Sequence, residues 1–200
     1  MTELLRSSTP AIGNAATTII KTPRLTLRAP RAEDASAIAA IANDRRIAEN
    51  TARLPHPYRL MDAQEFIAYA NGTDREIMFV ITLAGDRIIG SCGVGSIDGR
   101  CPEIGYWLGA SSWGNGYATE AARAVINHAF TTLGYDILSA GARVSNPASR
   151  RVLEKCGFQW TGVALRRSRA VGSHVPVDRF RLERGAWAKT RSLGEMENVA

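Results

Sequence analysis

The alternation of apolar and polar residues predicts a chain that mixes short strands with amphipathic helices. Residues 24–28 alternate as a half-buried strand does, and Ile38 and Ile41 then fall at helical spacing. A further helix is predicted over residues 62–71. Three strand-like runs joined by short links follow and indicate an antiparallel meander: 78–83, 87–94 and 103–108.

The strongest periodicity lies between residues 117 and 133, where apolar residues recur at the spacing of one long amphipathic helix. A strand is predicted after it, over residues 136–144. Because a helix connects this strand to the one at 103–108, the two strands should be parallel neighbours. The pattern therefore predicts a mixed sheet.

The last third of the chain carries the signals of a short helix followed by two strands. Asn146 can cap the start of the helix, with Pro147 as its first residue, and Gly157 followed by Phe158 fits its end. The closing strands are predicted over residues 158–163 and 177–183. Together these elements predict an α/β fold of the α+β type.

Composition and charge narrow the functional classes without choosing one. The chain has 200 residues, enough for one domain with a sizeable core, and 45% of them are hydrophobic. Its net charge of +6 favours anionic partners, either nucleic acid or a phosphate-rich cofactor. Neither a signal peptide nor an apolar run of about 20 residues occurs, so we expect no membrane association.

The cysteines predict a reducing compartment and no metal site. Cys92, Cys101 and Cys156 are odd in number, and no two of them have the spacing of metal ligands. We interpret each as a small buried thiol of a cytoplasmic protein.

A glycine-rich segment, Trp113-Gly114-Asn115-Gly116-Tyr117-Ala118, stands between the strand at 103–108 and the long helix. Glycines let backbone N–H groups approach a ligand, and the start of a helix adds unpaired donors and the positive end of its dipole. The segment is therefore a candidate pyrophosphate site, although an ordinary tight turn explains the same residues. It lacks the third glycine of a dinucleotide-binding motif and the Lys-Ser/Thr of a P-loop.

A second informative segment runs from Asn146 to Phe158. A helix cap explains Asn146 fully, and Ser149 can be an ordinary residue of the first turn. Taken with the glycine-rich segment, however, it resembles the GNAT acetyltransferase superfamily, and more narrowly the branch of ribosomal-protein N-terminal acetyltransferases (RimJ/RimL-like). That branch shows Gly-Tyr-Trp-Leu, Trp-Gly-x-Gly-Tyr-Ala-Thr-Glu-Ala and Asn-x-x-Ser-x-x-(Val/Leu)-Leu-Glu-Lys-x-Gly-Phe, which the chain matches at 105–108, 113–121 and 146–158.

The resemblance covers roughly residues 22–190 and implies a GNAT fold. This is a twisted, mostly antiparallel sheet of about six to seven strands, with helices on both faces and a splayed central pair of parallel strands. Residues 1–21 are then a flexible arm and residues 191–200 a C-terminal tail. The resemblance also implies acetyl-CoA as cosubstrate and a primary amine as acceptor, either a protein N-terminus or a small molecule. Whether the chain acts alone or as a homodimer stays open.

The same resemblance assigns roles to individual residues. The turn amides from Gly114 to Ala118 would bind the pyrophosphate, the strand ending at Leu108 would pair with the pantetheine, and Asn146 would bond the pantetheine arm. The cofactor-binding residues that it implies are Tyr106, Trp107, Leu108, Trp113, Gly114, Asn115, Gly116, Tyr117, Ala118, Thr119 and Asn146.

Acetyl transfer requires a neutral amine, and amines are largely protonated at pH 7. Glu103 is the candidate base because it lies in the strand that leads to the acyl group, although a surface glutamate is the plain alternative. Ser149 would lie near the thioester sulfur and is the candidate donor to the leaving thiolate. No Cys–His pair suggests a covalent intermediate, so we expect direct attack in a ternary complex.

Two other classes of protein stay open. One is a non-catalytic domain that binds acyl-CoA and regulates a partner. The other is a basic nucleic-acid-binding domain, which ranks last because aromatic residues are only 7% of the chain and many fall inside the acetyltransferase motifs. In the acetyltransferase reading, the irregular stretch 45–61 and a loop over 164–177 should wall the acceptor pocket, with a basic run at Arg166, Arg167 and Arg169.

Overall fold

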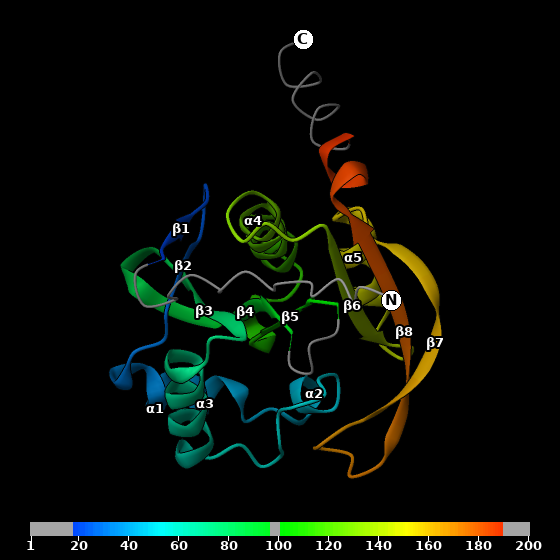
Figure 1. Ribbon diagram of the computed structural model, residues 1–200. Helices are drawn as coiled ribbons and strands as arrows, with labels where there is room; N and C mark the ends of the chain where they lie inside the picture. Colours follow the sequence, from blue (N-terminus) through cyan, green and yellow to red (C-terminus); the bar gives the residue numbers. More distant parts are fainter. Residues whose placement is uncertain (1–17, 97–100, 190–200) are drawn as a thin grey trace, which may run out of the picture.

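The computed structural model describes residues 18–96 and 101–189, which form one sheet of eight strands with covering helices (Figure 1). Every neighbouring pair of strands is antiparallel except β5 and β6. The predicted α+β class with a mixed sheet is confirmed. In sheet order the strands are β1 (Ile20–Lys21), β2 (Thr26–Arg28), β3 (Glu76–Leu83), β4 (Arg87–Gly95), β5 (Glu103–Leu108), β6 (Ile137–Arg143), β8 (His174–Glu183) and β7 (Gln159–Arg167).

The edge strand β1 lies in the segment that was predicted to be an arm. The Thr22 N–H donates to the Leu25 carbonyl oxygen at 2.9 Å, so a tight turn folds Ile20 and Lys21 back onto β2. Most of the predicted arm and the whole predicted tail lie outside the described residues. The domain boundaries therefore stay predictions.

Helices cover both faces of the sheet, as predicted (Figure 1). The long helix α4 (Tyr117–Thr131) and α5 (Pro147–Lys155) pack on one face. On the other face lie α1 (Ala35–Ala42) and α3 (Leu60–Gly72), and the short α2 (Arg45–Ala48) stands between them in the chain. Single 3₁₀ turns occur at Ala32–Asp34, Ala84–Asp86 and Ala110–Ser112.

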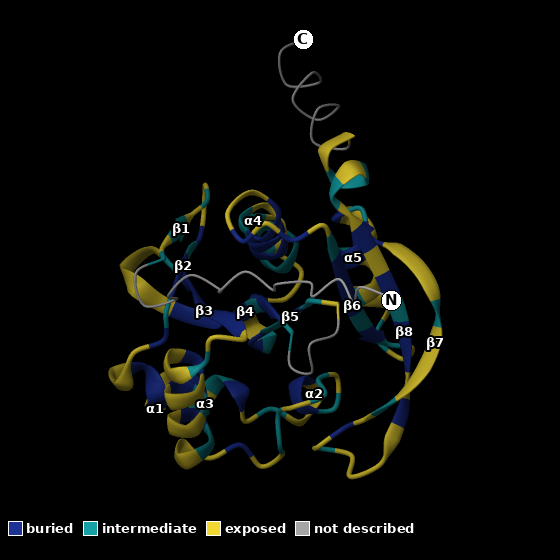
Figure 2. Ribbon diagram, viewed as in Figure 1, coloured by how far each residue is buried: buried dark blue, intermediate teal, exposed yellow. Residues whose placement is uncertain are grey.

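The alternation along β3 divides the core into two clusters. Ile77 and Phe79 are buried in the larger cluster with α4, whereas Val80 is buried with α1 and α3. Figure 2 shows the buried positions concentrated in the central strands and on the inner side of α4, with β7 exposed along most of its length. Packing against this core fixes the end of β5 relative to the start of α4, which are the two elements that build the site.

Local signals place α5 as predicted. Asn146 Oδ1 accepts a hydrogen bond from the Ser149 N–H at 3.1 Å, which caps the start of the helix. At the other end, the N–H groups of Gly157 and Phe158 bond back to carbonyl groups of the last turn at 3.0 and 3.1 Å, and Gly157 has a φ of +88°. This is the Schellman ending that the sequence predicts.

The C-terminal hairpin is longer than its sequence pattern predicts. β7 continues to Arg167 and β8 begins at His174, so the expectation of a loop over 164–177 is wrong. The Ser168 N–H donates to the Ser173 carbonyl oxygen at 3.0 Å and closes the hairpin. β7 lies at the sheet edge and is largely exposed, so it carries no alternation of buried and polar residues that would reveal a strand.

Candidate active site

The parallel strands β5 and β6 pair over two residues and then separate. Glu103 lies opposite Ser139 and Ile104 opposite Ala140, while the rest of β5 has no β6 partner among the described residues. The predicted splayed pair of parallel strands is therefore present. It opens the sheet at its centre, next to the turn that leads into α4.

Tyr106 and Leu108 direct their backbone groups toward this opening. The Gly109 N–H donates to the Ile89 carbonyl oxygen at 2.8 Å, and bonded pairs alternate with non-bonded pairs along an antiparallel ladder. Following the β4–β5 register, the backbone of Trp107 bonds to β4, whereas those of Tyr106 and Leu108 face β6. The N–H and C=O of Tyr106 and the N–H of Leu108 can therefore bind an extended pantetheine arm as an added strand.

The side chains of this strand point to both faces of the sheet. Tyr106 packs against the cluster that contains α4, and Trp107 packs against the cluster of α1 and α3. Trp113 Nε1 donates to the Leu108 carbonyl oxygen at 2.8 Å, and the Arg46 guanidinium carbon lies 5.4 Å from the centre of a Trp113 ring. Trp113 therefore ties the glycine-rich turn to the end of β5.

The glycine-rich turn contains two glycines with positive φ and leads into backbone amides that have no intrahelical acceptor. Gly114 and Gly116 have φ values of +79° and +78°, which glycine tolerates and other residues rarely adopt. The Glu120 N–H donates to the Gly116 carbonyl oxygen at 3.1 Å as the first bond of α4. Helix geometry therefore leaves three amides without an intrahelical acceptor, those of Tyr117, Ala118 and Thr119. Such a helix start is suited to an anion.

Arg24 lies beside this turn, and reasoning from the sequence missed it. Arg24 Nη1 donates to the Asn115 carbonyl oxygen at 3.0 Å, and its Cζ lies 4.7 Å from the centre of the Tyr117 ring. Glu120 holds Arg24 through Nε at 2.7 Å, and the same carboxylate accepts from the Thr22 hydroxyl at 2.7 Å. The turn thus has a cation at its edge.

The hydroxyl groups of Tyr106 and Ser149 meet between β5 and α5. Their oxygens are 3.0 Å apart, and the Tyr106 hydroxyl is also 3.1 Å from the Ser149 carbonyl oxygen. Burial raises the pKa of Tyr106 well above its usual value, and the Ser149 hydrogen bond opposes that shift only in part. The predicted donor Ser149 therefore has a second, neutral hydroxyl beside it, which the sequence did not indicate.

The candidate base Glu103 projects to the face of the sheet opposite Tyr106 and contacts two arginines. Arg166 contacts both carboxylate oxygens, with Nη2 2.6 Å from Oε2, and Arg179 Nη2 lies 3.9 Å from Oε2. The hydrogen bond with Glu103 raises the pKa of Arg166. The carboxylate is partly exposed, so an acceptor would reach it next to the positive charge of Arg166.

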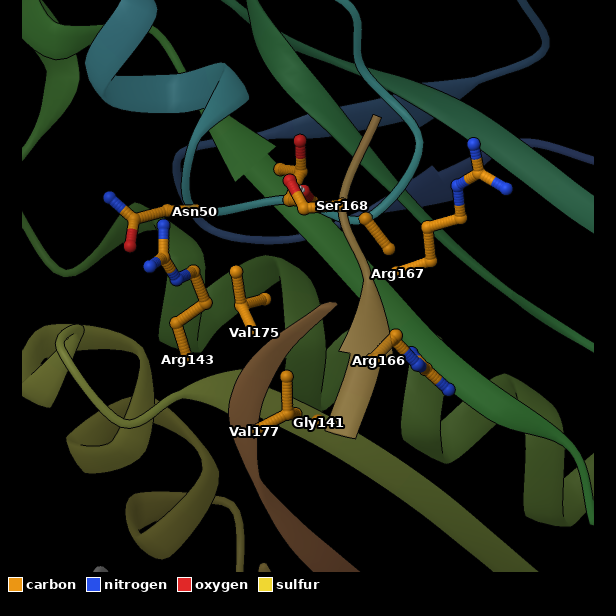
Figure 3. Close-up of a pocket in the computed structure, with 10 residues that line it drawn as sticks. Asn50, Gly141, Arg143, Arg166, Arg167, Ser168, Val175 and Val177 are labelled. Carbon is orange, nitrogen blue, oxygen red and sulfur yellow. Dashed lines mark hydrogen bonds between the residues drawn. The ribbon is translucent and has the colours of Figure 1, made fainter. Parts of the chain in front are cut away.

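A small cavity of about 40 Å³ is lined by Arg166, the partner of Glu103 (Figure 3). Gly141 lies in its wall, where a Cβ atom would come within 3.0 Å of Val177 Cγ1. The other walls come from residues 50–52, after α2, and from the hairpin of β7 and β8, which are the segments predicted to wall an acceptor pocket. Among its lining residues are Asn50, Thr51, Arg143, Arg166, Arg167 and Ser168.

The cysteines stay outside this chemistry. Cys92 and Cys156 are buried, and burial raises the pKa of both thiols, that of Cys156 to about 11. Cys101 is exposed, so the prediction of three buried thiols is wrong there, because Cys101 precedes β5 and lies outside the core. Within the described residues, no three His, Cys, Asp or Glu side chains gather to hold a metal ion, and no helix has the length and apolar character to cross a bilayer.

The strands β5 and β6 separate beside the start of α4, where backbone amides have no intrahelical acceptor. This arrangement fits an extended acyl carrier that bears phosphate groups. The family profile described as acetyltransferase (GNAT) domain matches residues 24–159. The chain therefore belongs to the GNAT acetyltransferase family, and acetyl transfer to an amine is the activity that this membership supports.

Individual relatives agree with this assignment. An uncharacterized N-acetyltransferase, p20 of Bacillus licheniformis, is 31% identical over 174 residues, which cover 84% of this chain and 97% of p20. The structure of Mycobacterium smegmatis RimJ in complex with CoA-disulfide is similar with a TM-score of 0.73 and 22% identity, covering 88% of this chain and 93% of RimJ. Spermidine N-acetyltransferase from Vibrio cholerae, in complex with CoA and spermine, gives a TM-score of 0.71 and 23% identity, covering 84% and 99%. At these identities the two structures establish the shared fold.

Proposed function

We propose that the protein is an acetyl-CoA-dependent N-acetyltransferase of the RimJ/RimL-like branch that acts on the α-amine of a protein or peptide. The observation that carries the proposal is the separation of β5 from β6 next to the start of α4. The N–H and C=O of Tyr106 and the N–H of Leu108 border this opening, whereas the Leu108 C=O accepts from Trp113. The amides of the glycine-rich turn follow a few residues later in the chain. A phosphate-bearing arm can bind both at once.

The remaining predicted contacts fit the same arrangement. The amides from Gly114 to Ala118 would hold the pyrophosphate beside Thr119, with Arg24 at the edge of the site. Asn146 uses Oδ1 as a helix cap, and its Nδ2 has no partner within the described residues. That amide group is therefore available to the pantetheine arm, so capping and ligand binding are compatible in one side chain.

Bound acetyl-CoA would supply an activated acetyl thioester. The acceptor nitrogen attacks the acetyl carbon and the carbon–sulfur bond breaks, so the amine loses one proton and the thiolate gains one. In our proposal Glu103 takes the amine proton, directly or through a water molecule, and the backbone N–H of Leu108 donates to the oxyanion. The hydroxyls of Ser149 and the neutral Tyr106 are hydrogen-bonded to each other, and together they return a proton to the thiolate.

The ion pair of Glu103 with Arg166 shapes this step. The guanidinium of Arg166 beside Glu103 disfavours a protonated amine at the same place. The acceptor therefore reaches the thioester in its neutral form, and Glu103 needs only to receive the proton that the attack releases.

Calorimetric titration with acetyl-CoA tests the proposal. The variant Gly116→Asp places a carboxylate where the pyrophosphate should bind, and Gly134→Asp is the matched control. Gly134 follows the other end of α4 with a φ of +73°, so the control carries the same backbone strain away from the site. We expect tight binding by the wild type and by Gly134→Asp, and none by Gly116→Asp. Absence of binding by the wild type would refute the proposed function.

Two alternatives are separated by the acceptor reaction. A small-molecule amine as acceptor keeps the same cofactor site, and a screen of peptides and small amines distinguishes the two. A regulatory domain that only binds acyl-CoA predicts no turnover with any amine. In our proposal Glu103→Gln binds acetyl-CoA normally but loses about 100-fold in kcat, the usual contribution of a general base. Glu183→Gln, an exposed carboxylate on β8, is the control.

A further inference from the structure

We propose that the acceptor carries, besides its amine, a negatively charged carboxylate or phosphate group that Arg143 binds. This rests on the proposed function, because it names the class of acceptor for the same site. Arg143 is the last residue of β6 and lines the cavity beside the Glu103–Arg166 pair. Figure 3 shows Arg143 and Asn50 on one side of this cavity and Arg166 on the other.

Only some of the hydrogen-bond donors of the Arg143 guanidinium have an acceptor. Its Nη1 donates to the Glu49 carbonyl oxygen at 2.6 Å, whereas its Nε is buried and has no hydrogen-bond partner among the described residues. The carboxylate of Glu49 pairs with Arg45 at 2.6 Å instead. The side chain is partly buried and forms no ion pair among the described residues, and the planar fork of arginine matches a carboxylate or a phosphate. A bound anion would complete this group.

The cavity wall around Arg143 is positively charged as a whole. The register of β6, β8 and β7 places Arg143, Arg166 and Arg179 on one face of the sheet. Glu103 lies between Arg166 and Arg179 and can balance one positive charge of the three. The remaining excess attracts an anion and repels a cation.

This charge distribution also separates classes of amine. A polyamine brings several positive charges to the arginines, so it is a poor match for this cavity. An amine that carries its own anionic group satisfies Arg143 and keeps its nitrogen neutral near Glu103. Both an acidic peptide and a small aminocarboxylate or aminophosphate have this chemistry.

Matched pairs of acceptors test the inference. The peptide pair is Ser-Glu-Glu-Ala-amide and Ser-Gln-Gln-Ala-amide, and the small-molecule pair is O-phosphoethanolamine and ethanolamine, with spermidine as a cationic acceptor. The readout is kcat/KM from the release of the CoA thiol. Dissociation constants for the same pairs, measured in the presence of CoA, give a readout that does not depend on turnover. The pair with the larger ratio identifies the source of the anion.

We expect the anionic member of at least one pair to be preferred by roughly 10- to 100-fold, the range for a hydrogen bond to a charged group. Arg143→Gln should reduce that ratio to about 1, and Arg143→Lys should keep part of it, since a point charge replaces the fork. Arg87→Gln, an exposed arginine at the start of β4, should leave the ratio unchanged. Melting curves establish that each variant is folded.

The results separate this inference from the proposed function. Equal kcat/KM values and equal dissociation constants within both pairs, or a preference for spermidine, overturn the inference and leave the acetyltransferase in place. Absence of turnover with every acceptor argues against the proposed function. In that case the dissociation constants still show whether the protein prefers the anionic member of each pair. A preference that survives unchanged in folded Arg143→Gln also overturns the role of Arg143.

Discussion

The hydroxyl of Tyr106 lies 3.0 Å from the hydroxyl of Ser149, although 43 residues separate them in the chain. Either oxygen can donate to the other, so the pair can pass a proton toward a thiolate. Burial raises the pKa of Tyr106, so the phenol stays protonated and is the proton donor to the thiolate in our proposal. Ser149 then orients it.

The first prediction concerns the variants of this pair. Tyr106→Phe should lower kcat by about 100-fold, as removal of a general acid does, while the dissociation constant of acetyl-CoA changes little. Ser149→Ala should lower kcat less, and the double variant should match Tyr106→Phe because the two hydroxyls act in series. Steady-state kinetics and calorimetry measure both quantities. Tyr69→Phe on the exposed side of α3 is the control, and multiplicative losses in the double variant would contradict the coupling.

The pH profile of the reaction gives the second prediction. Burial raises the pKa of Tyr106, so the phenol stays protonated throughout the range in which an amine acceptor titrates. With a peptide acceptor, kcat/KM should rise with pH through about 8, the pKa of an α-amine, and then stay level to about pH 10. An acceptor with a free α-amine, assayed from pH 6 to pH 10, provides the measurement. A decline that begins near pH 9 and vanishes in Tyr106→Phe would contradict the raised pKa.

The elements that build the site differ in how far their sequence predicts them. The period of α4, the cap at Asn146 and the ending at Gly157 are local signals, so the structure reproduces them. The parallel pairing of β5 and β6 also follows from the order strand, helix, strand. The extent of the C-terminal hairpin could not be predicted in this way, because β7 lies at the sheet edge and is exposed along most of its length.

The side-chain partners in the site could not be predicted from the sequence, for a different reason. Arg24 lies 91 residues from Asn115, and Arg166 lies 63 residues from Glu103, so no spacing rule connects them. Such pairs form only after the sheet has brought separate strands and turns together. The assignment of site residues stays a prediction, whereas the charge balance around Glu103 comes from the structure.

The third prediction concerns Arg24 at the edge of the glycine-rich turn. Arg24→Ala removes the bond to the Asn115 carbonyl oxygen and the contact with the Tyr117 ring. We expect the dissociation constant of acetyl-CoA to rise by about 5- to 10-fold, about 1 kcal/mol, since the group is half exposed and screened by solvent. The effect should shrink at high salt, where exposed charges are screened. Calorimetry at two salt concentrations measures it, with kcat at saturating acetyl-CoA expected to stay the same. A loss of kcat with unchanged affinity would assign Arg24 a different role.

The last prediction concerns the buried ion pair that holds the start of α1 to β2. Arg28 contacts Asp34 at 2.7 Å, and both side chains are only 6% exposed. Burial opposes the ionisation of Asp34, but hydrogen bonds from Arg28 and from the Arg31 N–H outweigh it, so the pKa of Asp34 is lowered from 3.8. Asp34→Asn leaves the buried guanidinium with the half-exposed Asp86, 2.9 Å away, as its remaining counter-charge. The change should cost about 2 kcal/mol of unfolding free energy at pH 7.

The pH dependence of this loss follows from the direction of the shift. Because the folded pKa of Asp34 is the lower one, the carboxylate stabilises the fold above pH 3.8, and its contribution is lost as the pH falls through the folded value. The difference in unfolding free energy between wild type and Asp34→Asn should therefore be full at pH 7 and shrink below pH 3.8. Urea titrations followed by tryptophan fluorescence measure it, with the exposed Asp136→Asn as the control. A difference that stays constant down to pH 3 would show that packing around the side chain, rather than its charge, stabilises this corner of the fold.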